Sequence, residues 1–83
     1  MALLIPPEVL KQLAAMPKAG RKRLLDALEV VAAEPAKRFP FVTQMVGQAG
    51  IWRLRKGDWR AVYRIHQGDV ILDRVGHRRE VYR

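Results

Sequence analysis

A chain of 83 residues is long enough for one small domain with a modest core and too short for several. Its apolar start, Ala2 to Ile5, is far shorter than the about 18 residues of a membrane span and lacks a basic flank, so we expect a cytoplasmic protein with no membrane contact. The absence of cysteine excludes disulfides and thiolate metal sites, and the net charge of +8 indicates nucleic acid or an acidic protein as the partner class.

The N-terminal residues predict a short strand followed by a helix. The strand covers Ala2 to Ile5 and is closed by Pro6 and Pro7. Pro7 suits the first position of a helix and Glu8 suits its first turn, so the helix is expected to run from there to about Met16. The apolar residues of this segment keep helical spacing, and they are Val9, Leu10, Leu13 and Met16.

A second helix is predicted to start near residues 18–21 and to end where Glu34 precedes Pro35, because a residue before proline avoids the helical conformation. Its apolar stripe consists of Leu24, Leu25, Leu28, Val31 and Ala32. Together the two helices predict a helical hairpin with one apolar face, which needs a sheet to cover it. Residues 36–50 are interpreted as a connecting loop that holds a turn or a short edge strand around Phe41 to Val46.

From residue 51 onward the apolar pattern changes to a period of two, which predicts strands. One strand is predicted from Ile51 to Lys56, a turn follows at Gly57 and Asp58, and the next strand runs from Trp59 to Ile65. Because side chains alternate along a strand, basic residues gather on one face and aromatic residues on the other. The basic face carries Ile51, Arg53, Arg55, Arg60, Val62 and Arg64. The opposite face carries Trp52, Leu54, Ala61, Tyr63 and Ile65.

Residues 67–69 form the next turn, and a third strand is predicted from Val70 to Val75, in which spacing leaves the facing of Asp73 and Arg74 undecided. The order of elements, β-α-α-β-β-β, predicts an α+β fold for a single domain over residues 1–83, with the helical hairpin packed on a small antiparallel sheet. The first strand is expected to join the edge of this sheet. One face then packs on the helices and the other carries arginine.

The basic residues are concentrated in the C-terminal part of the chain. Residues 50–83 carry 9 basic and 4 acidic side chains, whereas the longer segment 1–49 carries 7 and 4. Eight of those 9 basic residues are arginine, whose planar guanidinium group makes bidentate contacts with phosphate or carboxylate. The composition of this part therefore favours such contacts over solubility alone.

Most catalytic signatures are missing. The chain contains no serine and no glycine-rich phosphate loop, and His66 and His77 stand apart from other metal ligands, so neither a metal site nor a cofactor is expected. The remaining groups suit RNA cleavage, in which the 2′-hydroxyl attacks its own phosphate and the protein orients groups and neutralises charge. Arginines suit the second task, and a tyrosine or histidine can transfer a proton or stack on a base.

The stretch "GIWRLRKGDWRAVYRI" followed by "RVGHRREVYR" resembles the RelE/ParE superfamily of type II toxin–antitoxin toxins, and it is closest to the RelE branch. The resemblance covers nearly the whole chain and implies a compact β-α-α-β-β-β fold. For RelE-like members it implies metal-independent cleavage of mRNA in the ribosomal A site, held in check by a cognate acidic antitoxin similar to RelB.

The resemblance also implies the site residues. It implies a catalytic set of Arg55, Arg60, Arg78 and Tyr82. In addition, we predict an RNA-binding set of Arg53, Lys56, Arg64, His77 and Arg79. RelE has lysines at the positions of Arg53 and Arg55, and since guanidinium stays protonated, Arg55 is a poor general base. The segment between Arg78 and Tyr82 is shorter than in RelE.

Two other functions remain open at this point. A ParE-like toxin would use the same fold to inhibit DNA gyrase without cleaving RNA. A non-catalytic basic module would bind RNA or an acidic peptide in a salt-sensitive way and would not affect growth.

Overall fold

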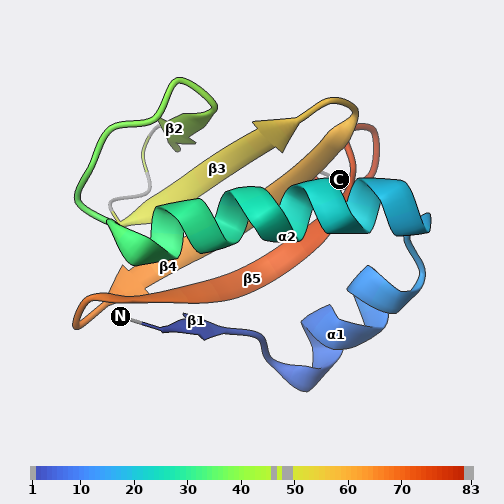
Figure 1. Cartoon of the computed structure of the whole chain (residues 1–83), viewed down its shortest axis with the longest axis horizontal. Coiled ribbons are helices and arrows are strands. Elements are labelled where there is room, and N and C mark those ends of the chain that lie inside the picture. Colours follow the sequence, from blue (N-terminus) through green and yellow to red (C-terminus); the bar gives the residue numbers. More distant parts are fainter. Residues whose placement is uncertain (1, 46, 48–49, 82–83) are drawn as a thin grey trace.

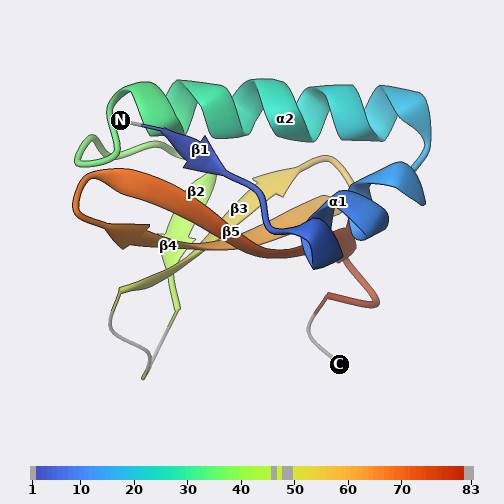
Figure 2. The ribbon, with the colours of Figure 1, turned by 90° about the horizontal axis from the view of Figure 1, so that it is seen from below.

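The computed structural model describes residues 2–45, 47 and 50–81. Two helices, α1 (Pro7–Ala14) and α2 (Lys18–Ala33), pack on one face of a five-stranded sheet (Figures 1 and 2). The strands are β1 (Leu3–Leu4), β2 (Val42–Gln44), β3 (Ile51–Lys56), β4 (Trp59–His66) and β5 (Asp69–His77). The expected α+β fold is confirmed, and a short strand, β2, lies within the segment where a turn or edge strand was expected.

The sheet has the strand order β1-β5-β4-β3-β2, with β3, β4 and β5 forming an antiparallel meander and β2 extending it beside β3. The first strand joins the edge as expected, but it runs parallel to β5, so the sheet is mixed rather than wholly antiparallel. Parallel neighbours need a long connection, and the segment between β1 and β5 contains both helices. The Ala2 amide donates to Asp69 Oδ1 at 2.9 Å, which fixes the start of this edge.

Several boundaries differ from those expected. The strand β1 covers only Leu3–Leu4 rather than Ala2 to Ile5, and β4 ends at His66 rather than at Ile65. The first helix ends at Ala14 rather than near Met16, because Met16 precedes Pro17 and a residue before proline is disfavoured in the helical region. The strand β5 is longer than the predicted segment, since it pairs with β4 along its whole length, from His66 opposite Asp69 to Trp59 opposite His77.

A bulge in β5 explains why spacing leaves the facing of Asp73 and Arg74 undecided. Val62 pairs with Arg74 and Tyr63 pairs with Leu72, so Asp73 is an extra residue with no partner on β4. The bulge lets Leu72 and Val75, three positions apart, both face the helices and be buried, while Asp73 and Arg74 are exposed.

The core lies between the helices and the sheet. The stripe predicted on α2 is buried at Leu24, Leu28, Val31 and Ala32, and Leu25 packs at its margin. The sheet contributes Leu54, Ala61, Tyr63, Val70, Leu72 and Val75. None of the described helices is long and apolar enough to cross a membrane.

The buried phenol of Tyr63 makes stability sensitive to alkaline pH. Burial raises the pKa of Tyr63 from its ordinary 10 to about 12. Between these two values the unfolded chain loses this proton before the folded chain does. The contribution of the protonated Tyr63 hydroxyl to the unfolding free energy is therefore present below pH 10 and is lost as the pH rises towards 12. We therefore expect the unfolding free energy, measured by urea unfolding, to fall less steeply over this pH range in Tyr63→Phe than in the wild type.

Absorbance titration gives a control for this prediction, because Tyr82 is the chain's other tyrosine. In a Tyr82→Phe variant the remaining phenol should ionise well above pH 10 in the folded state and near 10 in urea. Ionisation near 10 in both states would contradict the effect of burial.

Candidate nucleic-acid interface

The sheet face opposite the helices carries a set of arginines. Leu54, Ala61 and Tyr63 face the helices, so their neighbours along β3 and β4 face the other way. The arginines on this face, which we call the open face, are Arg53, Arg55, Arg60, Arg64 and Arg74. Arg55 lies directly opposite Arg60 in the β3–β4 pair. Like charges in that arrangement destabilise a sheet unless an anion lies near them, which favours a binding role.

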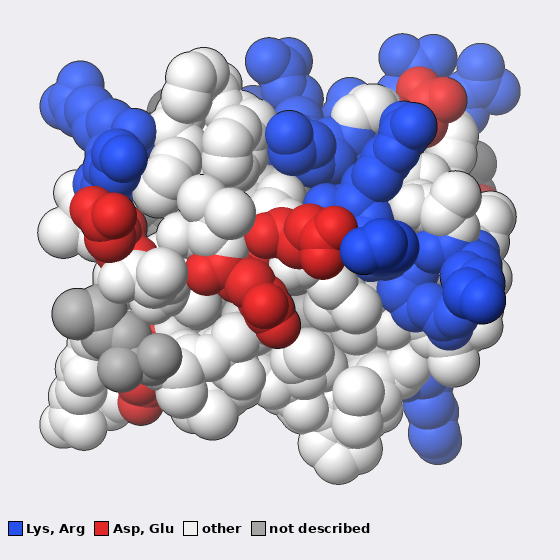
Figure 3. Space-filling model, viewed as in Figure 1, with Lys and Arg blue, Asp and Glu red and all other residues white. Residues whose placement is uncertain are grey.

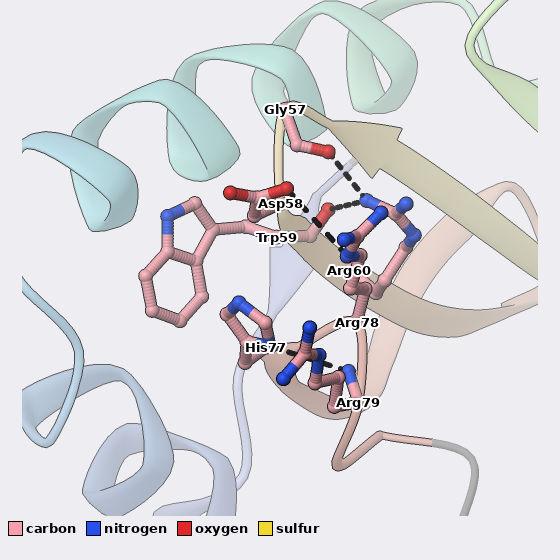
Figure 4. A network of polar contacts seen from close by, with 7 residues as sticks. All are labelled: Gly57, Asp58, Trp59, Arg60, His77, Arg78 and Arg79. Atoms are coloured by element: carbon pink, nitrogen blue, oxygen red, sulfur yellow. Dashed lines mark hydrogen bonds and ion pairs between the residues drawn. The ribbon is translucent and has the colours of Figure 1, made fainter.

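The guanidinium group of Arg60 is fixed by the backbone of the β3–β4 turn. Its Nη1 donates to the carbonyl oxygens of Gly57 at 2.7 Å and Trp59 at 2.9 Å (Figure 4). The contacts of this side chain within the described part of the protein use Nη1 alone, so its other donors are available to a ligand. Arg60 is therefore a positive group held in place without a carboxylate that would neutralise it.

Arg78 reaches the same turn from the end of β5. Its amide donates to the Asp58 carbonyl oxygen at 2.8 Å, and its Nε lies 3.7 Å from Asp58 Oδ1. Both side chains are exposed, at 52% and 66%, so solvent screens this ion pair and it neutralises Arg78 only weakly. Three of the four predicted catalytic residues, Arg55, Arg60 and Arg78, are thus brought together at one end of the sheet.

The other arginines of the predicted set lie at varying distances from this turn. Arg53 occupies the next position along β3 on the open face. Arg64 lies further along β4, where its Nε contacts Asp73 Oδ1 at 3.1 Å. The side chain of Arg79 is exposed, and its amide donates to His77 Nδ1 at 3.3 Å. The charge of Arg64 is therefore offset by an acidic partner at hydrogen-bond distance.

Lys56 and His77 are not brought onto the open face. Lys56 Nζ lies 4.7 Å from the centre of the Phe41 ring, a cation–π contact at the sheet edge. The His77 ring meets the Trp59 indole edge to face, 5.5 Å between centres. Side chains alternate along a strand, so Lys56 shares the helix-facing side of β3 with Leu54, and this placement could have been predicted from the sequence. Tyr82, the remaining predicted residue, lies outside the described residues.

The indole of Trp59 links α2 to the turn that holds Arg60. A methyl group at Gly20 would lie 2.6 Å from Trp59 Cε2 and 2.8 Å from Cδ1, so glycine alone leaves room for the ring. Figure 4 shows the indole and the His77 ring on one side of the turn and the guanidinium groups of Arg60 and Arg78 on the other. The helix side of the turn is therefore packed, and its open side is charged.

The start of α2 adds positive charge at this end of the molecule, and none of its residues is among the predicted site residues. Four basic residues occupy the first six positions of the helix, and they are Lys18, Arg21, Lys22 and Arg23. The first turn has no acidic residue, although the helix dipole disfavours cations there. Figure 3 shows Lys and Arg gathered at the end where α2 begins. The missing acidic residue is the sequence signal that could have identified this surface.

A large groove lies at the opposite end of the sheet. It has a volume of about 1230 Å³ between the loop after α2, strand β2 and the far ends of β3 and β4, and its lining includes Phe39, Trp52, Tyr63 and Ile65. None of the predicted site residues lines it. Its size alone therefore does not make it the site of phosphate chemistry.

The fold is similar to those of several solved toxins. A RelB–RelE antitoxin–toxin complex from Methanococcus jannaschii matches with a TM-score of 0.79 and 22% identity, over 95% of this chain and 94% of that chain. A RelE–RelB complex from Pyrococcus horikoshii OT3 matches with a TM-score of 0.77 and 26% identity, over 96% and 97%. The isolated RelE toxin of E. coli matches with a TM-score of 0.78 and 22% identity, over 96% and 88%.

Sequence comparison gives the family. None of the curated proteins compared with the chain matches it significantly. The family described as "ParE toxin of type II toxin-antitoxin system, parDE" matches residues 3–82, which is nearly the whole chain. The chain therefore belongs to this toxin family, within the RelE/ParE superfamily, and its fold is close to that of RelE.

Proposed function

We propose that the protein is a ribosome-dependent endonuclease that cleaves mRNA in the ribosomal A site and so inhibits translation. One observation carries the proposal: Arg55, Arg60 and Arg78 converge at the β3–β4 turn, where backbone carbonyl groups fix Arg60. A strongly basic site of this kind suits a phosphodiester whose charge increases during reaction. The protein acts in the cytoplasm, where its substrate is.

The reaction needs no nucleophile from the protein. The ribose 2′-oxygen loses its proton and bonds to the adjacent phosphorus, the bond from phosphorus to the 5′-oxygen breaks, and the leaving oxygen takes up a proton. The products are a 2′,3′-cyclic phosphate and a free 5′-hydroxyl. The protein contributes by bending the strand in line and by stabilising the negative charge on the phosphoryl oxygens.

The arginines divide this work by position. Arg53 and Arg55 hold phosphates along the open face, and Arg60 stabilises the charge of the transition state with the donors that the turn leaves available. Arg78 screens the negative charge that develops on the leaving 5′-oxygen. Because a guanidinium group stays protonated, the group that accepts the 2′-proton is not Arg55. Tyr82 orients a base or the nucleophile.

A cognate antitoxin is proposed as the protein partner. The relatives from Methanococcus jannaschii and Pyrococcus horikoshii were solved as complexes with RelB. The net charge of +8 suits a net acidic, amphipathic segment that folds on binding and covers the basic surface. Such a segment would block access of RNA to the same arginines.

Mapping of transcript ends tests the proposed activity. After induction of the wild-type chain, we expect new 5′-hydroxyl ends inside translated messages at fixed codon positions, and none in untranslated RNA. The Arg60→Ala, Arg78→Ala double variant, confirmed as folded by circular dichroism, should relieve growth arrest and produce no such ends. Growth arrest with intact transcripts would refute the nuclease.

A gyrase inhibitor is the second candidate, and the ParE description of the matching family favours it. The same induction separates the two functions, because gyrase inhibition predicts DNA damage and intact transcripts. Normal growth on induction, with salt-sensitive binding of RNA or acidic peptide, would instead support a non-catalytic module.

A further inference from the structure

The C-terminal turn, residues 77–81, folds back onto the open face of the sheet. Figure 2 shows the chain leaving β5 on the side away from α2. Val81 is only 4% exposed, yet it lies outside the core between the helices and the sheet. It packs on Gly76, where a methyl group would lie 3.0 Å from Val81 Cγ2. The amides of Glu80 and Val81 both donate to the His77 carbonyl oxygen, at 2.8 and 3.1 Å. The described part of the chain thus ends in a closed, packed turn.

Arg74 holds this turn from the sheet. Its Nη1 donates to the Val81 carbonyl oxygen at 3.0 Å, and the residue stands on β5 opposite Val62, two positions before Gly76. A hydrogen bond from a charged donor is stronger than one between neutral groups. Arg74 therefore differs from Arg64 on the same face, whose guanidinium contacts a carboxylate of its own sheet and not the turn.

We propose that Arg74 is a positioning residue of the candidate site. By holding the Val81 carbonyl group it keeps the turn closed, and it thereby keeps Arg78, at the start of the turn, against Asp58. The effect on RNA cleavage rests on the proposed function, but the effect on the turn does not.

The competing role for Arg74 is a plain phosphate contact on a basic face. The two roles differ in which other variant Arg74→Ala should resemble. If Arg74 positions the turn, Arg74→Ala should resemble Gly76→Val, whose added side chain displaces Val81 without changing any charge. If Arg74 only binds phosphate, Arg74→Ala should resemble Arg64→Ala, which removes a charge from the same face without touching the turn.

Hydrogen–deuterium exchange of the purified full chain without RNA tests the structural part. In Arg74→Ala the amides of Glu80 and Val81 should exchange about tenfold faster, since the closed turn loses a charge-assisted hydrogen bond. Exchange at Leu72, in the core, should stay at the wild-type rate, which separates local opening from global destabilisation. Exchange at Glu80 and Val81 that is equal in Arg74→Ala, Arg64→Ala and the wild type would overturn the proposal.

Cleavage kinetics on programmed ribosomes test the functional part. Arg74→Ala and Gly76→Val should lower kcat by about tenfold to a hundredfold with little change in KM, as expected when reacting groups are misplaced. Arg64→Ala should mainly raise KM. A rise in KM alone for Arg74→Ala would assign it to phosphate binding and overturn the positioning role. If the wild type cleaves no RNA, the proposed function fails, while the exchange result still decides whether Arg74 closes the turn.

Discussion

Replacing Arg60 with alanine should lower the rate constant of RNA cleavage by about 100-fold to 1000-fold, the loss typical of removing one fixed donor from a site of developing charge. The effect is large because the guanidinium group is already held by Gly57 and Trp59 and needs no reorganisation during the reaction. Single-turnover cleavage on programmed ribosomes measures this rate constant directly.

Two further variants define the role of Arg60. Arg64→Ala removes the same charge from the same strand and face, but Arg64 contacts Asp73 and lies away from the turn, so it should weaken RNA binding more than it slows cleavage. Arg60→Lys keeps the charge but loses the planar fork, and it should recover only part of the rate. A folded Arg60→Ala variant that cleaves within about tenfold of the wild type would remove Arg60 from the transition state.

A methyl group at Gly20 should destabilise the fold through Trp59. The added Cβ would enter the space of the indole, which also packs against the His77 ring, and overpacking of this kind costs about 1 to 3 kcal/mol. Alanine gains about 1 kcal/mol in helix propensity over glycine, so Gly20→Ala should lose a net of up to about 2 kcal/mol. Urea unfolding at equilibrium measures the difference.

The background variant Trp59→Leu supplies the control for Gly20. Without the indole, only the gain in helix propensity remains, so Gly20→Ala should be neutral or stabilising in that background. Equal effects of Gly20→Ala with and without the indole would show that the close approach does not limit stability.

Much of the fold can be predicted from local pattern. Period-two alternation with a glycine turn identifies the β3–β4 hairpin, and the same alternation places Arg53, Arg55 and Arg60 on the face opposite Leu54 and Tyr63. The helices follow from apolar spacing and from the prolines at their ends. These features depend on residues near in sequence, which is why the pattern is sufficient.

Features that depend on contacts between distant segments could not be predicted. The parallel pairing of β1 with β5 joins residues far apart in the chain, and the bulge at Asp73 breaks the period on which facing depends. The convergence of Arg78 with Arg60 requires the end of β5 to lie beside the β3–β4 turn. Likewise, the role of Gly20 appears only when Trp59 is in place. The functions of the individual site residues stay predictions.

The position of β5 bears on how this domain folds during synthesis. Although it follows the other described strands in the chain, β5 lies inside the sheet, between β1 and β4. It also packs against α1, whose Gln12 Oε1 accepts a hydrogen bond from the Val75 amide at 2.9 Å. Until residues 69–77 have left the ribosome, β1 lacks the strand that it pairs with and α1 lacks the strand that it packs on. In a nascent chain, β1 and α1 can therefore reach their native packing only after β5 has been made. Long-range pairing of this kind slows folding.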